Sequence, residues 1–197
     1  MTLVEAVVIV ALIALLASML LPGLVHAKSR RHQGSCYNNL RQIGAAFRVW
    51  AGDYDDKYPM EVSVTNGGSK EFVNTPQAFQ HFNVLSNDLG LLPILLICPS
   101  DSTRRAAKGF GPGFCNSNLS YFINVSATTN SDPFNTILCG DRNITPVGNR
   151  LFVTQSNQVV KWDASIHKNR GWILYADGSA VEITQPFRCS GETLSIP

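Results

Sequence analysis

An uncharged aliphatic segment near the start of the chain constrains the fold most strongly. From Ala6 to Val25 no side chain is charged, and nearly every residue is aliphatic. About 20 apolar residues in succession are enough for a helix to cross a bilayer. No basic residue precedes the segment, as one would in a secretory signal. We therefore expect residues 1–25 to form a hydrophobic helix that lies in a membrane or in the core of a polymer.

One carboxylate, Glu5, lies at the beginning of this segment. A charged group on an apolar membrane helix is costly unless it is paired. Two interpretations remain open. The carboxylate can reach water at the membrane surface, where it also favours the positive end of the helix dipole. Alternatively, it pairs with a cationic group of another chain, because no Lys, Arg or His lies close to it in this segment.

Composition excludes two broad classes of protein. The chain has 197 residues, a formal net charge of +2 and 15% charged residues. Proteins that hold nucleic acid usually present a strongly basic face, so no specific nucleic-acid partner is expected. The 45% of apolar residues also argues against a disordered chain. Residues 1–50 carry five basic side chains and one acidic one, and the remainder carries 11 and 13. This imbalance predicts a basic stem and a mildly acidic head.

An amphipathic helix is predicted directly after the apolar segment, over residues 26–52, ending near Gly52-Asp53. Its apolar side chains recur at spacings of four, three, four and three, which is the period of one helix face. They are Cys36, Leu40, Ile43, Phe47 and Trp50. Such a stripe needs a partner surface, which residues 53–197 have to supply as a globular head.

The clearest strand signals of the head lie near its end. Four segments are rich in β-forming residues: Arg150 to Gln155, Val159 to Asp163, Gly171 to Ala176 and Ser179 to Thr184. The Asp177-Gly178 pair between the last two suits a type I′ hairpin turn. Residues from Asp53 to Asn149 are expected to be rich in loops, with a brief helix near Gln77 to Leu85. The pattern favours an α+β fold in which an antiparallel sheet packs on the helical stripe.

The start of the chain resembles the mature N-terminus of type IV pilins and type II secretion pseudopilins. Met1-Thr2-Leu3-Val4-Glu5, a run of aliphatic residues and then Pro22 follow that pattern. The resemblance implies the type IV pilin fold, a leader removed by a prepilin peptidase and an N-methylated Met1. It also implies that Glu5 neutralises the N-terminal amine of a neighbouring subunit, and that the helix kinks or melts near Pro22 and Gly23. Such subunits are anchored in the inner membrane and then form an extracellular filament on the cell surface.

A second pattern narrows the resemblance. His167, nine intervening residues and Asp177-Gly178 resemble the prepilin-type domain with a His–nine–Asp-Gly motif, which is found in planctomycetes, verrucomicrobia and their relatives. Further blocks that look like this domain are Cys36-Tyr37-Asn38-Asn39-Leu40-Arg41-Gln42, Cys98-Pro99-Ser100-Asp101, Leu119-Ser120-Tyr121-Phe122 and Gly140-Asp141-Arg142-Asn143. Together these blocks span nearly the whole chain.

The function that this resemblance implies is structural. We expect a pilin that polymerises with identical copies into a helical filament, assembled by pilus or secretion machinery and serving adhesion, motility, secretion or DNA uptake. One alternative is a major pseudopilin of a short periplasmic filament, and another is a membrane-anchored binding module that never polymerises. An anchored hydrolase that uses His167 and Asp177 is the weakest alternative. The sequence contains no Gly-x-Ser-x-Gly, His-Glu-x-x-His or phosphate-loop motif, so no enzyme is expected.

Five cysteines fit an exported head. They are Cys36, Cys98, Cys115, Cys139 and Cys189, and two bridges among them allow 15 connectivities. The resemblance implies a bridge between Cys36 and Cys98, because both lie in blocks shared with the family. A second bridge between Cys115 and Cys139 is preferred. No Cys-x-x-Cys pair is present, which argues against a zinc or haem site.

No cofactor is expected, although calcium remains an alternative. Asp53-Tyr54-Asp55-Asp56 looks like half of a calcium loop, but it lacks the downstream Gly and Glu of an EF-hand. Asp141 and Asp177 are further candidates, and with His167 they could converge on a metal or form a catalytic dyad. Three Asn-x-Ser/Thr triplets are candidate glycosylation sites, at Asn118, Asn124 and Asn143.

Overall fold

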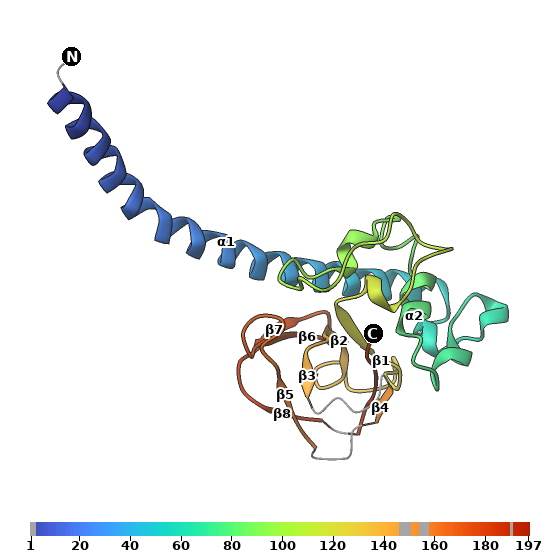
Figure 1. Cartoon of the computed structure of the whole chain (residues 1–197). Helices are drawn as coiled ribbons and strands as arrows, with labels where there is room; N and C mark the ends of the chain where they lie inside the picture. The colour runs from blue at the N-terminus through green and yellow to red at the C-terminus, as the bar shows by residue number, and fades with distance from the viewer. Residues whose placement is uncertain (1–2, 146–150, 154–157, 190) are drawn as a thin grey trace. The chain divides into compact units, whose positions relative to one another are not determined.

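The computed structural model describes residues 3–145, 151–153, 158–189 and 191–197. The chain is mixed α+β with antiparallel sheets (Figure 1). Its first element, α1 (Leu3–Asp53), is one helix of 51 residues, which ends where the amphipathic pattern predicted. The chain divides into two units, Met1–Gly34 and Ser35–Pro197, so α1 contributes to both. From here on we call the second unit the head; it includes the end of α1 in addition to the residues 53–197 that were predicted to form the head.

The first unit is the N-terminal portion of α1. The aliphatic side chains described between Leu3 and Leu16 are exposed. The helix runs through Pro22 and Gly23 without interruption, so the predicted melting near these residues is not observed in the single chain.

The structure corrects the prediction of an inner-membrane anchor over residues 1–25. A bilayer-spanning helix needs about 20 predominantly apolar residues. Within the described part of the chain, no helix combines enough length with enough apolar character to cross a membrane. The predicted anchoring in the inner membrane is therefore not supported.

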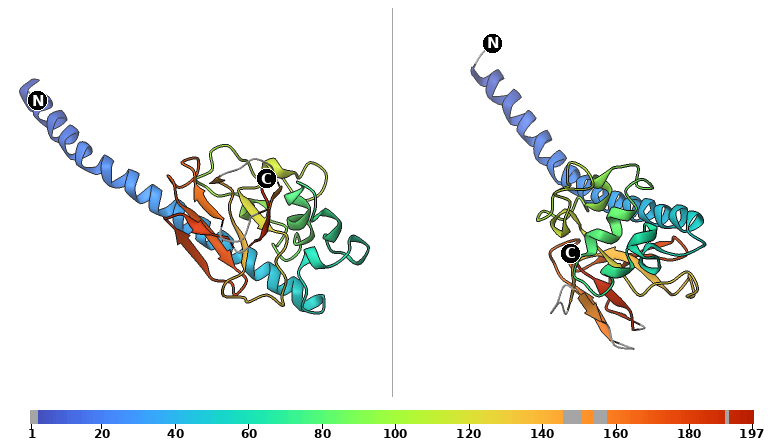
Figure 2. Two further views of the ribbon diagram at one scale, coloured as in Figure 1. Left: turned by 90° about the horizontal axis from the view of Figure 1, so that it is seen from below. Right: turned by 90° about the vertical axis from the view of Figure 1, so that its right-hand side faces the viewer.

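The head contains short helical turns followed by strands. Between α1 and the first strand lie α2 (Ala78–Val84) and five 3-10 turns: η1 (Pro59–Glu61), η2 (Val64–Asn66), η3 (Lys70–Phe72), η4 (Pro93–Leu96) and η5 (Asn116–Asn118). The strands are β1 (Tyr121–Asn124), β2 (Ile137–Asp141), β3 (Ile144–Thr145), β4 (Leu151–Val153), β5 (Val159–Trp162), β6 (Gly171–Tyr175), β7 (Ala180–Ile183), β8 (Phe187–Arg188) and β9 (Thr193–Ser195). Figure 2 shows the helical turns gathered on one side of the head and the strands on the other.

The strands form two sheets. The larger one has six strands in the order β4-β9-β1-β2-β6-β7, and every described pairing in it is antiparallel. The smaller one has the order β3-β5-β8. The predicted hairpin is present, because β6 pairs with β7 across the Asp177-Gly178 turn. The central strands β1 and β2, however, lie in the region that we expected to consist mainly of loops.

Alternation along the central strands creates a core on each face of the larger sheet. On β1, Phe122 belongs to one core and its neighbours Tyr121 and Ile123 belong to the other. On β6, Ile173 and Leu174 divide in the same way. This is the period of two that a strand imposes on its side chains. One core contains the helical stripe, and the other contains residues of the smaller sheet.

The head portion of α1 packs on the larger sheet through the amphipathic stripe. All five stripe residues are buried in the core that also contains Tyr121, Leu138 and Leu174. Gly44 allows the close approach, because a β-carbon at this position would lie 3.0 Å from Cδ1 of Leu174. The helix thus places one end of its stripe, Cys36, beside the segments that form the candidate site.

Candidate functional site

A disulfide between Cys36 and Cys98 connects α1 to the segment that follows η4. The two Cα atoms are 5.2 Å apart, and the bond joins residues 62 positions apart in the sequence. One turn along the helix, the Asn39 side-chain amide donates a hydrogen bond to the Ile97 carbonyl, with an N···O distance of 3.0 Å. This bridge is the one that the family resemblance implied.

The second predicted bridge, between Cys115 and Cys139, is wrong. Both residues are thiols in the structure. Cys115 is exposed next to η5, whereas Cys139 is buried in the central strand β2. Cys189 is also buried.

His167 lies in an unusual turn between β5 and β6. The three consecutive residues His167, Lys168 and Asn169 all have positive φ angles, of 52°, 53° and 66°. Each such residue costs roughly 1 kcal/mol or more when it carries a β-carbon. A run of three persists only where other contacts hold the backbone in place.

The Asn143 side chain supplies those contacts. Its Nδ2 group donates hydrogen bonds to three carbonyl oxygens of the turn, at N···O distances of 2.9, 2.9 and 3.2 Å; they belong to Asp163, Ile166 and Arg170. Asn143 is buried just after β2. It therefore positions the loop that carries His167, a role that its sequence context did not reveal.

The His167 ring lies between the disulfide and a buried carboxylate. Its Nε2 atom is 3.1 Å from Sγ of Cys98 and 3.5 Å from Oδ2 of Asp141. Only 1% of the His167 side chain is exposed, and the Asp141 side chain is fully buried. We call Cys36, Cys98, His167 and Asp141 the buried cluster.

Burial dominates the electrostatics of Asp141. It raises the pKa of this carboxyl to about 8, although the backbone N–H of Trp172 donates a hydrogen bond to Oδ2 at 2.8 Å and acts in the opposite direction. The other oxygen, Oδ1, is buried and has no hydrogen-bond partner among the described residues. The Asp141 carboxyl therefore loses its proton at a higher pH than an exposed aspartate does.

A second buried carboxylate, Asp101, joins three of the sequence blocks described above. It pairs with Arg142 at an Nε–Oδ2 distance of 2.7 Å, and the Ser120 hydroxyl donates to the same oxygen at 3.0 Å. Burial acts to raise the pKa of Asp101, but hydrogen bonds from Arg142 and Thr103 outweigh it and hold the pKa below its usual value. The blocks that carry the family resemblance thus meet beside the buried cluster.

The remaining sequence candidates do not join this cluster in the ways predicted. Asp177 caps the β6–β7 turn, because its Oδ1 accepts a hydrogen bond from the Ser179 N–H at 2.8 Å. Asp53 and Asp55 are exposed at and just after the end of α1. Among the described residues, the calcium candidates do not form a group of three metal-ligating side chains.

The glycosylation prediction is corrected at two of its three positions. Asn124 and Asn143 are 1% and 2% exposed, and their amide groups donate to backbone carbonyls inside the head. Asn118 is half-buried, and its Nδ2 donates to the Arg105 carbonyl at 2.9 Å. An amide nitrogen that is buried in the folded head, as at Asn124 and Asn143, is not available for attachment of a sugar, whereas the prediction at Asn118 stays a prediction.

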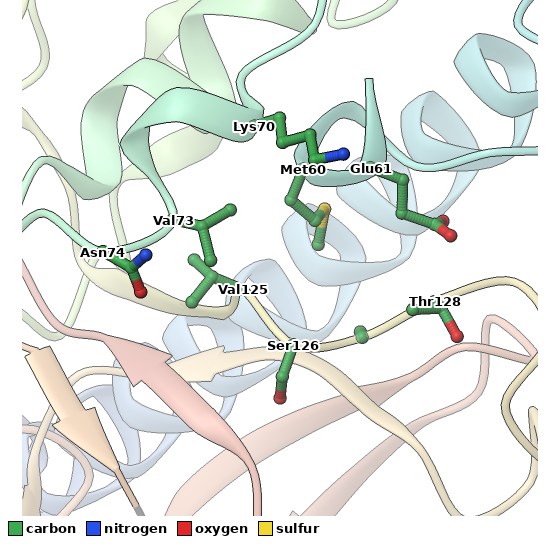
Figure 3. A pocket seen from close by; sticks show the side chains of 9 residues that line it. Met60, Glu61, Lys70, Val73, Asn74, Val125, Ser126 and Thr128 are labelled. Carbon is green, nitrogen blue, oxygen red and sulfur yellow. The ribbon is translucent and has the colours of Figure 1, made fainter. Parts of the chain in front are cut away.

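An open cavity of about 460 Å³ lies at another part of the head (Figure 3). Its lining is mixed, and consists of Met60, Glu61, Lys70, Val73, Asn74, Val125, Ser126, Ala127 and Thr128. The Glu61 carboxylate already accepts hydrogen bonds from the backbone N–H groups of Tyr58 and Thr129, at 2.8 and 3.4 Å. The carboxylate of this cavity therefore stabilises the backbone around it and is not free to bind a ligand.

The buried cluster contains groups that can take part in redox, metal-binding and proton-transfer chemistry, but a substrate cannot reach it. Both sulfur atoms belong to fully buried residues, and His167 and Asp141 are equally inaccessible. Comparisons with family models, curated proteins and solved structures gave no match. The arrangement is suited to holding α1 on the sheet. It is also suited to binding a small ion or to a change in the redox state of the disulfide.

Proposed function

We propose that this chain is a structural subunit that polymerises into a helical filament of the type IV pilin class. The observation that carries the proposal is a helix surface of exposed aliphatic side chains. It comprises Leu3, Val4, Val7, Val8, Ile9, Val10, Leu12, Ile13, Leu15 and Leu16. We call it the aliphatic surface.

The aliphatic surface surrounds the helix instead of forming a stripe. Successive residues are turned by about 100°, so these ten positions cover all sides of the helix axis. A helix that is apolar all round is stable when it is buried among other apolar groups. In the proposed filament, the same segments of neighbouring copies provide that burial, and each aliphatic side chain contributes about 1.5–3 kcal/mol when fully buried.

Glu5 has a defined place in this assembly. It is exposed in the first turn of α1, next to the aliphatic surface. A carboxylate inside a packed apolar core requires a cationic partner. A neighbouring copy supplies that partner in the proposed filament, and the pair sets the axial register between subunits.

The head also supports the proposal. An antiparallel sheet packed on the C-terminal portion of the N-terminal helix is compatible with the type IV pilin fold that the sequence resemblance implies. The inaccessibility of the buried cluster favours a structural role over a catalytic one. A filament that remains short would favour the secretion pseudopilin alternative over a pilus.

The test is an assembly experiment on the full chain with two matched valine variants. Purified protein is followed by sedimentation velocity and negative-stain electron microscopy over a range of concentrations. Val8→Asp places a charge in the aliphatic surface, and Val49→Asp places the same charge on the head portion of α1. The two valines are similarly exposed, at 51% and 56%.

We expect the parent and Val49→Asp to form filaments of uniform diameter, and Val8→Asp to remain unassembled. Glu5→Ala should also prevent ordered filaments. Circular dichroism of each variant shows whether the head is folded. A parent chain that stays monomeric at every concentration, or a Val8→Asp variant that assembles like the parent, would overturn the proposal.

A further inference from the structure

Three potential metal ligands from distant parts of the sequence meet in the buried cluster. Sγ of Cys36, Sγ of Cys98 and Nε2 of His167 all lie within 4.8 Å of one another. They come from α1, from the segment after η4 and from the β5–β6 turn. Among the described residues, this is the one group of three or more such side chains that gathers so closely.

The donor set suits a thiophilic divalent ion. Two thiolates and one imidazole are ligands that zinc takes in proteins, at about 2.3 Å for sulfur and about 2.0 Å for nitrogen. Ligand atoms around one such ion are therefore no more than about 4.6 Å apart. The two sulfur atoms and the imidazole nitrogen already lie within 4.8 Å of one another, which is close to this limit. Small side-chain adjustments are therefore enough to place them around one ion once the sulfur atoms are no longer bonded to each other.

Two further features favour this arrangement. The strained turn holds His167 with its Nε2 atom towards Cys98, and the hydrogen bonds of Asn143 fix that turn. Asp141 places a carboxylate next to the same nitrogen, and its buried Oδ1 has no hydrogen-bond partner in the described structure. Buried polar atoms without a partner are uncommon, and a bound ion or an ion-bound water satisfies such an atom.

We propose that reduction of the Cys36–Cys98 disulfide converts the buried cluster into a zinc-type metal site with Cys36, Cys98 and His167 as ligands. The same three side chains thus provide two alternative cross-links between α1 and the rest of the head. One is the covalent bond, and the other is a metal ion. This site is independent of the proposed filament function.

A trialkylphosphine reductant and one water cleave the sulfur–sulfur bond, which gives two thiols and one phosphine oxide. The divalent ion then displaces one proton from each thiol and binds two thiolates and the neutral imidazole nitrogen. Two protons are therefore released for each ion bound, as deprotonated ligands require.

The experiment uses the full chain, reduced with a phosphine that is removed under anaerobic conditions. Cobalt(II) is added first, because thiolate ligation gives a sulfur-to-cobalt charge-transfer band in the near ultraviolet. We expect one equivalent of cobalt to bind, two protons to be released, and zinc to displace the cobalt. The oxidised chain should show no charge-transfer band.

Matched variants identify the ligands. His167→Asn retains a residue type that tolerates a positive φ, and it should weaken metal binding by about 10-fold or more. Lys168→Asn makes the same change at the next position of the turn and should bind like the parent. Cys36→Ser combined with Cys98→Ser should abolish the band, whereas Cys115→Ser, at an exposed thiol, should preserve it.

Far-ultraviolet circular dichroism separates loss of folding from loss of ligands. If the reduced chain is partly unfolded, added zinc should restore the signal and raise the melting temperature in the parent but not in His167→Asn. Absence of a charge-transfer band in the reduced parent at millimolar cobalt would overturn the proposal. Equal affinities of the parent and His167→Asn would overturn it as well.

Discussion

The guanidinium group of Arg48 occupies the space where a β-carbon on Gly178 would lie. The same arginine approaches the Asp177 carbonyl, with an Nη1···O distance of 3.4 Å. Helix α1 and the β6–β7 turn therefore meet through a long cationic side chain and a residue without a side chain. This contact gives the Asp177-Gly178 pair a packing role in addition to its role in the turn.

We predict that Gly178→Ala destabilises the head by about 1–2 kcal/mol, because Gly178 has a φ of +83° and the left-handed region penalises a β-carbon. The arginine can move aside, so the backbone conformation provides most of the effect. Urea denaturation measures the change. Gly109→Ala is the control, since a β-carbon there meets no atom within 4 Å. Equal midpoints for the two variants would contradict the prediction.

The disulfide should account for a large share of head stability. In the chain-entropy description, a bridge between residues 62 positions apart contributes about 4 kcal/mol to the free energy of unfolding. We expect the double variant Cys36→Ser, Cys98→Ser to lose about this amount in urea denaturation. Cys115→Ser removes an exposed thiol and should leave the midpoint unchanged. A loss below about 1 kcal/mol would show that packing alone holds the helix.

His81 should make stability depend on pH. Burial lowers the pKa of this imidazole to about 4, although a hydrogen bond to the Phe72 carbonyl opposes the shift. The unfolded chain therefore binds more protons than the folded chain between about pH 4 and 6.5. The free energy of unfolding should rise across this interval, by at most about 3 kcal/mol, and the gain is lost as the pH falls.

Two variants test this assignment. His81→Asn should remove the rise between pH 4 and 6.5, whatever its effect on absolute stability. Ser69→Ala removes the 2.8 Å hydrogen bond to Nδ1 of His81 but retains the titrating ring, so the rise should persist. Urea midpoints at a series of pH values provide the measurement. If His81→Asn keeps the full pH dependence of the parent, another group is responsible.

Asn143 should be essential for the position of His167. Asn143→Ala removes hydrogen bonds to three carbonyl groups of the turn, of which the one at Ile166 is buried, and a buried group left without a partner costs about 1–3 kcal/mol. We expect a loss of at least about 2 kcal/mol and faster hydrogen exchange in residues 164–170. Asn38→Ala, at an exposed position of α1, should change stability by no more than about 0.5 kcal/mol. Unchanged exchange in Asn143→Ala would contradict this role.

Local periodicity and turn chemistry predicted the amphipathic part of α1 and the hairpin near the end of the chain. The helical stripe ending at Trp50 and the four terminal strands were expected from spacing and turn chemistry, and α1 and the β6–β7 hairpin appear where predicted. Strands β1 and β2 were missed because both of their faces are buried and because a long connection, instead of a two-residue turn such as Asp177-Gly178, joins them. A strand that is buried on both sides lacks the alternation of apolar and polar residues that identifies a strand.

The sequence predicted less of the candidate site than of the fold. His167 and Cys98 are 69 residues apart. Of the two aspartates that we expected to converge with His167, Asp141 lies 3.5 Å from its Nε2 atom, whereas Asp177 accepts a hydrogen bond within the β6–β7 turn. Nothing in the local pattern distinguishes Asn143, which acts through three carbonyls of a distant loop, from a surface asparagine. Contacts of this kind depend on the order of the strands in the sheet, and this order cannot be predicted from the spacing of residues along the sequence.

The position of the disulfide determines how the head would respond to mechanical load. Cys36 is the second residue of the unit that begins at Ser35. When a pulling force is applied between the residues before Cys36 and those after Cys98, it passes through this covalent bond to Cys98. The helical turns after Cys36 are shielded from tension, so α1 cannot be peeled from the sheet turn by turn. Under such a load the disulfide bears the tension. Cleavage of this bond would transfer the tension to the packing contacts between α1 and the larger sheet.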